Sequence, residues 1–85
     1  MFYIYILQNS SGRFYIGYTS NLEERIKRHQ QGRSPYTKNR GPWKLVYSES
    51  YPTKTQAAAR EKFIKSKKSS VFIKKLIDQK NQALS

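Results

Sequence analysis

Two short tyrosine motifs near the start of the chain carry the side chains best suited to chemistry. They are YIY at residues 3–5 and YIG at residues 15–17, and the polar segment NSSG at 9–12 separates them. The chain holds 17 Lys and Arg against 5 Asp and Glu, which gives a formal net charge of +12. A charge so far from zero favours binding to a polyanion, and a phosphate backbone is the commonest one. Phenol groups on such a protein predict chemistry on nucleic acid.

Both motifs lie in segments that alternate between large apolar and aromatic residues. Residues 2–7 and 13–18 therefore predict the two strands of a β-hairpin. The connecting turn leaves two registers open. A loop centred on Ser10 places Tyr5 opposite Tyr15 on the same face of the sheet. A two-residue loop at 11–12 places these tyrosines on opposite faces unless a bulge intervenes.

A helix is expected to follow the hairpin. The sequence SNLE at 20–23 fits a capping box with Ser20 as the N-cap, and the helix should end near residue 31, before a glycine. Two apolar residues one turn apart, Leu22 and Ile26, form its buried stripe. Arg25 and His29 lie along the edge of that stripe, so we expect them where the helix borders a cleft.

The remainder of the chain predicts one more strand and two more helices. We expect a loop over 32–42, a strand over 44–50, a helix over 53–65 that begins with the capping box TKTQ, a break at 66–70 and a helix over 71–80. The order β-β-α-β-α-α predicts an α+β fold, in which helices pack on a small, three-stranded, mostly antiparallel sheet. Residues 1–80 form one domain in this prediction, and 81–85 form a frayed tail.

Composition excludes several classes of protein. The chain has no cysteine, which excludes disulfides and zinc sites built on thiolates, and its single histidine argues against a zinc–histidine cluster. No apolar run approaches the roughly 20 residues that cross a bilayer. A basic segment followed by a long apolar core is missing at the N-terminus, so we expect no signal peptide and a cytoplasmic location.

Taken together, these features resemble the GIY-YIG nuclease family. The second family signature is present letter for letter at 15–17, whereas the first is altered and begins with tyrosine instead of glycine. The separation of ten residues between Tyr5 and Tyr15 also fits the family, as do Arg25 on the next helix and Glu61 on a later one. The resemblance covers nearly the whole chain and is closest to the short, stand-alone bacterial members.

The resemblance implies a divalent-metal-dependent endonuclease that hydrolyses DNA, with Mg²⁺ or Mn²⁺ as cofactor and a role in DNA repair or recombination. The family's metal-binding glutamate corresponds to Glu61, and its tyrosine base corresponds to Tyr5, whose pKa a nearby Arg25 and a metal would lower. Tyr15 would orient water or phosphate, and Arg25 would bind the scissile phosphate through its planar fork. His29 would donate to the phosphate or shuttle a proton, unless it is simply packed.

The other cations are expected to grip the nucleic-acid backbone without reading its sequence. The predicted contacts are Gly17, Arg33, Lys38, Arg40, Lys65, Lys67 and Lys68, and Arg60, Lys62, Lys74 and Lys75 belong to the same basic stretch. Gly17 would let the backbone or the substrate approach closely because it has no Cβ. Trp43 is interpreted as a core residue, with stacking on a splayed base as the alternative.

Two other functions remain open. One is a nucleic-acid-binding module, for DNA or RNA, that keeps the nuclease fold without turnover, and the other is a basic RNA-associated protein. Glu61 favours the enzyme, because binding alone requires no carboxylate among so many cations. The alternative for Glu61 is an ordinary salt-bridged helix residue. We expect a monomer or a weak homodimer with no membrane partner.

Overall fold

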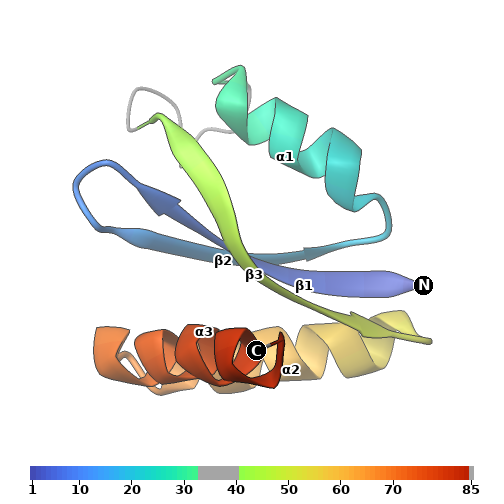
Figure 1. Cartoon of the computed structure of the whole chain (residues 1–85). Helices are drawn as coiled ribbons and strands as arrows, with labels where there is room; N and C mark the ends of the chain where they lie inside the picture. Colours follow the sequence, from blue (N-terminus) through green and yellow to red (C-terminus); the bar gives the residue numbers. More distant parts are fainter. Residues whose placement is uncertain (33–40, 85) are drawn as a thin grey trace.

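The structure, a computed structural model, describes residues 1–32 and 41–84, and of 81–84 it describes the backbone alone. Its elements are β1 (Phe2–Asn9), β2 (Phe14–Thr19), α1 (Leu22–Gln30), β3 (Trp43–Tyr51), α2 (Lys54–Ser66) and α3 (Ser70–Leu84). The predicted order of elements and the α+β fold are confirmed. Figure 1 shows three layers, with α1 over one face of the sheet and both α2 and α3 on the other.

The sheet is antiparallel, with the strand order β2-β1-β3. The central strand β1 is the most protected element, and its residues 4–7 have no exposed surface. Successive side chains of a strand point to opposite faces, so burial on both faces requires helices on both sides. The outer strand β2 has no further strand beside it in the described chain, and this edge becomes important for the site.

The hairpin between β1 and β2 has neither of the two predicted registers. Tyr5 pairs with Gly17, and Leu7 pairs with Tyr15. The Asn9 side chain accepts from the backbone N–H groups of Ser11 and Arg13 at 3.1 and 2.8 Å, which moves the centre of the turn one residue beyond Ser10. Tyr5 and Tyr15 therefore share a face, as the first register requires, but they lie diagonally rather than opposite each other.

The helix caps agree with the sequence in one case and differ in the other. Thr53 caps α2, and its hydroxyl accepts from the Gln56 N–H at 3.3 Å, as predicted. The cap of α1 is Asn21, whose side chain accepts from the Glu24 N–H at 3.1 Å, so the prediction of Ser20 is wrong by one residue. The shift arises because the Thr19 hydroxyl binds the Asn21 N–H at 3.1 Å and delays the start of the helix.

The two faces of the sheet form two separate apolar clusters. The cluster beneath α2 and α3 is largely aliphatic and consists of Ile4, Ile6, Ile16, Tyr47, Ala57, Ile64 and Ile73. The cluster beneath α1 is smaller and more aromatic, with Tyr5, Leu7 and Trp43 at its centre and Tyr15, Leu22 and Ile26 around it. The interpretation of Trp43 as a core residue is confirmed, since it is 4% exposed.

The C-terminal helix differs from the prediction at its end. Its inward-facing residues are those expected, with Ile73 buried and Phe72, Leu76 and Ile77 packed against the core. However, α3 continues to Leu84, so the predicted end at residue 80 is wrong. The assignment of 81–85 to a frayed tail stays a prediction. In the described part of the chain, no helix has the length and apolar character needed to span a membrane.

Candidate active site at the β2 edge

A cavity of about 540 Å³ opens at the β2 edge of the sheet. Side chains reach it from both faces, since α1 lies on one side of this edge and α2 on the other. The predicted site residues that line it are Tyr5, Tyr15, Gly17, Arg25, Glu61 and Lys65. Lys54, at the start of α2, adds another cation to the lining. We call this cavity the edge pocket.

Gly17 gives the phenol of Tyr5 its route into the edge pocket. The two residues are paired across β1 and β2, and a Cβ on Gly17 would lie 2.5 Å from the Tyr5 hydroxyl oxygen and 2.7 Å from Cζ. Real Cβ atoms do not approach a neighbour so closely, so any side chain here would displace the ring. The close approach predicted for Gly17 is therefore made first of all by the tyrosine of the neighbouring strand.

The Tyr5 hydroxyl also contacts the single histidine of the chain. Its oxygen lies 2.9 Å from His29 Nε2. The His29 ring lies 4.7 Å from the Tyr15 ring, measured between centroids, and is 2% exposed. His29 is not among the residues that line the edge pocket. It is thus placed to act on the pocket through Tyr5, which suits a proton shuttle better than a direct donor to phosphate.

Burial decides the protonation of both groups. Desolvation raises the pKa of the Tyr5 phenol well above 10, and the nearby Tyr15 and Glu61 raise it further. Arg25 lowers that pKa through its charge and a hydrogen bond, as predicted, but burial outweighs it. Arg25 alone therefore does not lower the pKa of Tyr5 below its ordinary value, and the additional effect of a bound metal stays a prediction. Desolvation lowers the pKa of His29 below 6.5, and the charges of Arg25 and Arg28 lower it further.

Arg25 is half-buried on α1, next to the apolar stripe that anchors this helix. The other α1 cations pair within the helix, Lys27 with Glu23 at 3.9 Å and Arg28 with Glu24 at 3.5 Å. Among the described residues, no such ion pair involves Arg25. Its guanidinium group therefore faces the pocket without a carboxylate to neutralise it, which suits an anionic ligand.

Glu61 supplies the carboxylate of the edge pocket from α2. Its side chain is 18% exposed, and the Lys65 ammonium group lies 3.1 Å from it. The alternative of a salt-bridged helix residue is thus also observed, although the Lys65 side chain is half exposed. The described residues contain no cluster of three His, Cys, Asp or Glu that could hold a metal ion. One carboxylate fits Mg²⁺ all the same, because this ion often binds through one or two carboxylates and completes its shell with water and substrate oxygens.

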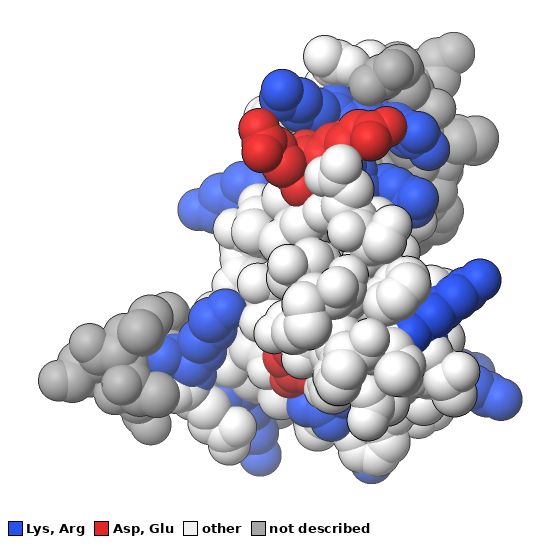
Figure 2. Space-filling model, turned by 90° about the vertical axis from the view of Figure 1, so that its right-hand side faces the viewer, with Lys and Arg blue, Asp and Glu red and all other residues white. Residues whose placement is uncertain are grey.

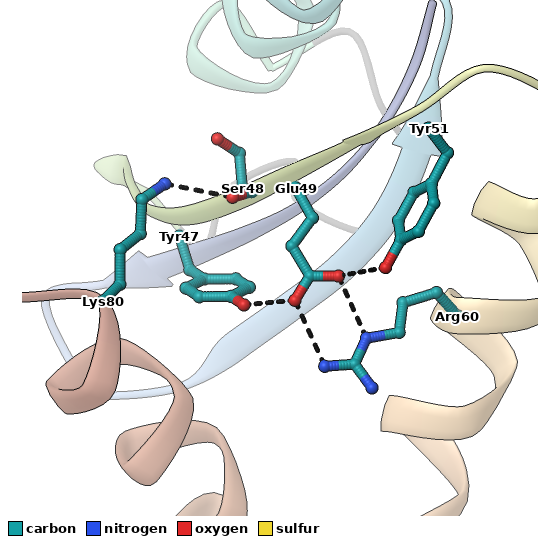
Figure 3. A network of polar contacts seen from close by, with 6 residues as sticks. All are labelled: Tyr47, Ser48, Glu49, Tyr51, Arg60 and Lys80. Atoms are coloured by element: carbon teal, nitrogen blue, oxygen red, sulfur yellow. Dashed lines mark hydrogen bonds and ion pairs between the residues drawn. The ribbon is translucent and has the colours of Figure 1, made fainter. Parts of the chain in front are cut away.

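A second carboxylate, Glu49, was not singled out by the sequence analysis. Figure 3 shows that Arg60 binds it with two nitrogens, at 3.0 and 3.2 Å, while the hydroxyls of Tyr47 and Tyr51 donate to the same carboxylate. We call these four residues the Glu49 network. The alternation of Tyr47, Glu49 and Tyr51 along one strand face was the available signal. Arg60 is paired with Glu49 here, which argues against the role in gripping DNA that was expected for it.

The Glu49 network also fixes α2 on the sheet. Burial alone would raise the pKa of Glu49, but hydrogen bonds from Arg60, Tyr47 and Tyr51 outweigh it and hold the pKa below 4.5. The ion pair ties β3 to α2 at the residue directly before Glu61. The rotation of α2 that aims Glu61 at the β2 edge is therefore held from β3, the strand at the other edge of the sheet.

The predicted cations have different surroundings. Lys65 and Lys68 line cavities along the β2 edge, whereas the Lys67 ammonium lies over the rings of Phe63 and Phe72 at 4.7 and 5.7 Å. Figure 2 shows acidic side chains gathered mainly near the α1 end of the visible face, and basic side chains spread around it. The predicted contacts Arg33, Lys38 and Arg40 lie outside the described residues.

Known proteins match this chain along most of its length. A family model described as the GIY-YIG catalytic domain matches residues 1–77. The UPF0213 protein of Clostridium perfringens is 48% identical over 66 residues, which cover 76% of this chain and 71% of that protein. The one from Staphylococcus saprophyticus is 45% identical over 64 residues, covering 74% and 78%. The solution NMR structure of the UPF0213 protein from Bacillus halodurans has a TM-score of 0.61 and 36% identity, covering 94% of this chain and 86% of that one.

Proposed function

Because the chain belongs to the GIY-YIG family and has its nuclease-type fold, we propose that it is a divalent-metal-dependent endonuclease acting on DNA. One observation carries the proposal. A phenol, a guanidinium and a carboxylate from three different elements line the same edge pocket, as Tyr5, Arg25 and Glu61. Phosphodiester hydrolysis needs a proton acceptor, a cationic phosphate site and a ligand for a metal, and these side chains match those needs.

Arg25 would bind the phosphate. Its guanidinium group stays charged at working pH and offers a planar fork to two non-bridging oxygens. Lys54 and Lys65 line the same pocket and would add to the positive potential that attracts the substrate. Tyr15 would orient the attacking water or the phosphate with its hydroxyl.

Tyr5 would pass on the proton of the attacking water. Its raised pKa means that the phenol is protonated in the free protein, so it needs an acceptor of its own. His29 would provide one, because its lowered pKa keeps the imidazole neutral and, in the Nδ1-protonated tautomer, Nε2 accepts from the hydroxyl at 2.9 Å. In one concerted step the phenol oxygen takes the proton of water as its own proton moves to His29.

Glu61 would hold the divalent metal. When bound, the ion supplies positive charge to the phosphate and to the departing oxygen. Lys65 competes for the same carboxylate at 3.1 Å and would have to swing aside, which its exposed side chain permits. Depletion of the metal with EDTA should therefore abolish cleavage and leave salt-sensitive DNA binding in place.

A nicking assay on supercoiled plasmid and on branched DNA tests the proposal, with Mg²⁺, Mn²⁺ or EDTA. We expect metal-dependent nicking by the natural sequence and none by a variant that combines Glu61→Gln, Arg25→Ala and Tyr5→Phe. The matched control combines Glu23→Gln, Arg13→Ala and Tyr51→Phe, which changes the same residue types outside the edge pocket and should retain activity. Equal nicking by both triple variants would reveal a contaminating nuclease or a wrong site.

A non-catalytic binding module is the second candidate. It is favoured by the Lys65–Glu61 ion pair, which neutralises the one carboxylate of the edge pocket. Salt-dependent DNA binding without cleavage in either metal, on any substrate shape, would decide for this candidate and against the endonuclease.

A further inference from the structure

A second cavity of about 580 Å³ lies along the same edge of the sheet, next to the edge pocket. The β2 residue Phe14, Ile64 of α2 and Ile73 of α3 line it, together with Lys65 and Lys68. It is therefore an apolar hollow that two lysines border. We call it the flanking cavity.

The flanking cavity continues the edge pocket. Tyr15, Ile16 and Lys65 line both of them. A chain that placed one phosphate at Arg25 would thus meet the flanking cavity as it left the edge pocket along β2. The two cavities form one groove with different chemistry at its two ends, cationic and acidic at one and apolar at the other.

This combination of surfaces suits one kind of occupant. A nucleotide joins a flat, aromatic, weakly polar base to an anionic phosphate, and single-stranded nucleic acid binds where aromatic side chains meet a basic groove. Phe14 and Tyr15 both line the flanking cavity. Phe14 is half-buried and packs on the face beneath α2 and α3, so its ring presents aromatic surface from that face, whereas Tyr15 lies where the flanking cavity meets the edge pocket. An apolar peptide would gain nothing from the lysines.

The backbone at Lys68 gives a further reason. Lys68 has φ of 47°, in the left-handed region that glycine and asparagine adopt more easily. It sits between α2 and α3, where a glycine would be the ordinary solution, yet the chain has a lysine whose side chain lines the flanking cavity. A cation at this point would pair with the phosphate of the nucleotide whose base occupies the hollow.

We infer that the flanking cavity binds one unstacked nucleobase of the DNA strand whose neighbouring phosphate occupies the edge pocket. The inference rests on the proposed function for the position of the strand. It assigns the base contact to Phe14 and Tyr15 instead of Trp43, which is buried. It also predicts that a strand with an unpaired base beside the phosphate binds better than one without.

The test compares two single strands of equal length and charge, oligothymidylate and an abasic strand of the same number of phosphates. Binding is measured by fluorescence anisotropy in EDTA, with the full chain. We expect the abasic strand to bind about five- to tenfold more weakly, because stacking on an aromatic side chain is lost while the phosphates are kept. Equal affinity for the two strands would overturn the inference.

Two variants locate the effect. Phe14→Leu keeps an apolar residue in β2 and should remove most of the difference between the strands. Phe63→Leu is the matched control, since Phe63 is 44% exposed and does not line the groove, and it should keep the full difference. Equal behaviour of these two variants would contradict the assignment.

A second measurement does not depend on how Phe14→Leu folds. A strand with one 5-iododeoxyuridine is photocrosslinked to the natural sequence, and the attached peptide is identified by mass spectrometry. We expect the crosslink at residues 14–15, and a crosslink only elsewhere would overturn the inference. Nicking in Mg²⁺ is measured separately. Equal strand affinities with intact nicking would refute the base site alone, whereas base-dependent binding without nicking would refute only the hydrolase.

Discussion

The two edges of the sheet, at β2 and at β3, carry the same set of residue types in two different states. The edge pocket has Tyr5, Tyr15, Arg25 and Glu61, and the Glu49 network has Tyr47, Tyr51, Arg60 and Glu49. In the network, the guanidinium and both phenols converge on the carboxylate. In the edge pocket, no ion pair joins the arginine and the glutamate within the described chain, and a cavity lies between them.

The difference separates a structural use of these groups from a functional one. A carboxylate that is fully hydrogen-bonded stabilises the fold and has no capacity left for a ligand. In the edge pocket, Glu61 is paired only with the half-exposed Lys65, and no ion pair within the described chain involves Arg25, so both groups can bind a third group, such as a phosphate or a metal ion, once Lys65 moves aside. Residue type alone does not distinguish these cases, whereas the partners of each side chain do.

The largest expected effect concerns the two glutamates. Glu61→Gln should lower the nicking rate by about a thousandfold, comparable to the loss of a key charge-stabilising group, while the free energy of unfolding changes by less than about 0.5 kcal/mol. Plasmid nicking and thermal unfolding measure the two quantities. Glu49→Gln should instead lower the free energy of unfolding and leave the nicking rate per folded molecule nearly unchanged. A large loss of stability in Glu61→Gln would remove the distinction between the two sites.

The second prediction compares the tyrosines. Tyr5→Phe should slow nicking by about a hundredfold, because the proton path from water to His29 is cut. Tyr51→Phe removes a phenol from the Glu49 network and should leave the nicking rate per folded molecule unchanged. Single-turnover kinetics on plasmid DNA separate the two variants. If both variants lose activity equally, the proton path proposed for Tyr5 is wrong.

The third prediction is the cost of breaking the Glu49 network. Glu49→Gln should reduce the free energy of unfolding by about 2 kcal/mol at pH 7, because Arg60 loses a charged partner. The pKa of Glu49 is lower in the folded chain than the unfolded value of 4.5, so its contribution exists above that value and is lost as the pH falls through the folded one. Urea unfolding at several pH values checks this, and a constant difference down to pH 3 would contradict it.

The smallest effect is the pH dependence that His29 brings. Its pKa is lowered on folding, so below the unfolded value of 6.5 the unfolded chain takes up the proton first and stability falls as the pH falls. His29→Gln should remove this slope between pH 6.5 and the folded pKa. Thermal unfolding at half-unit pH steps measures it. An unchanged slope in the variant would assign the titration to another group.

Much of the fold follows from local sequence patterns. The alternating pattern of large apolar and aromatic residues located the strands, and the capping residue Thr53 located the start of α2. Both signals depend only on residues that are a few positions apart in the sequence. The start of α1 differed because the side chain of Thr19, from the preceding strand, competes for the cap. The hairpin register differed because hydrogen bonds to the Asn9 side chain set the turn, and the alternating pattern of the strands does not predict them.

The site was harder to predict than the fold. Family resemblance selected Tyr5, Arg25 and Glu61, but the protonation of Tyr5 depends on burial in the finished core, which the sequence does not give residue by residue. The same limit applies to Arg60. Its position in a basic stretch suggested contact with DNA, whereas its partner Glu49 is 11 residues away and becomes a neighbour only when α2 packs on the sheet.

The edge pocket takes its reactive groups from elements that are held in place to different degrees. Tyr5 lies in β1, whose backbone pairs with a strand on each side, whereas Arg25 and Glu61 lie on helices that cover opposite faces of the sheet. The pocket thus has a floor held by strand pairing and two walls that belong to different helices, of which α2 is tied to β3 by the Glu49 network and α1 is not. A substitution under either helix, such as one at Ile26 or Ile64, would therefore change the rate by moving Arg25 or Glu61 relative to Tyr5, although no reactive group is itself replaced.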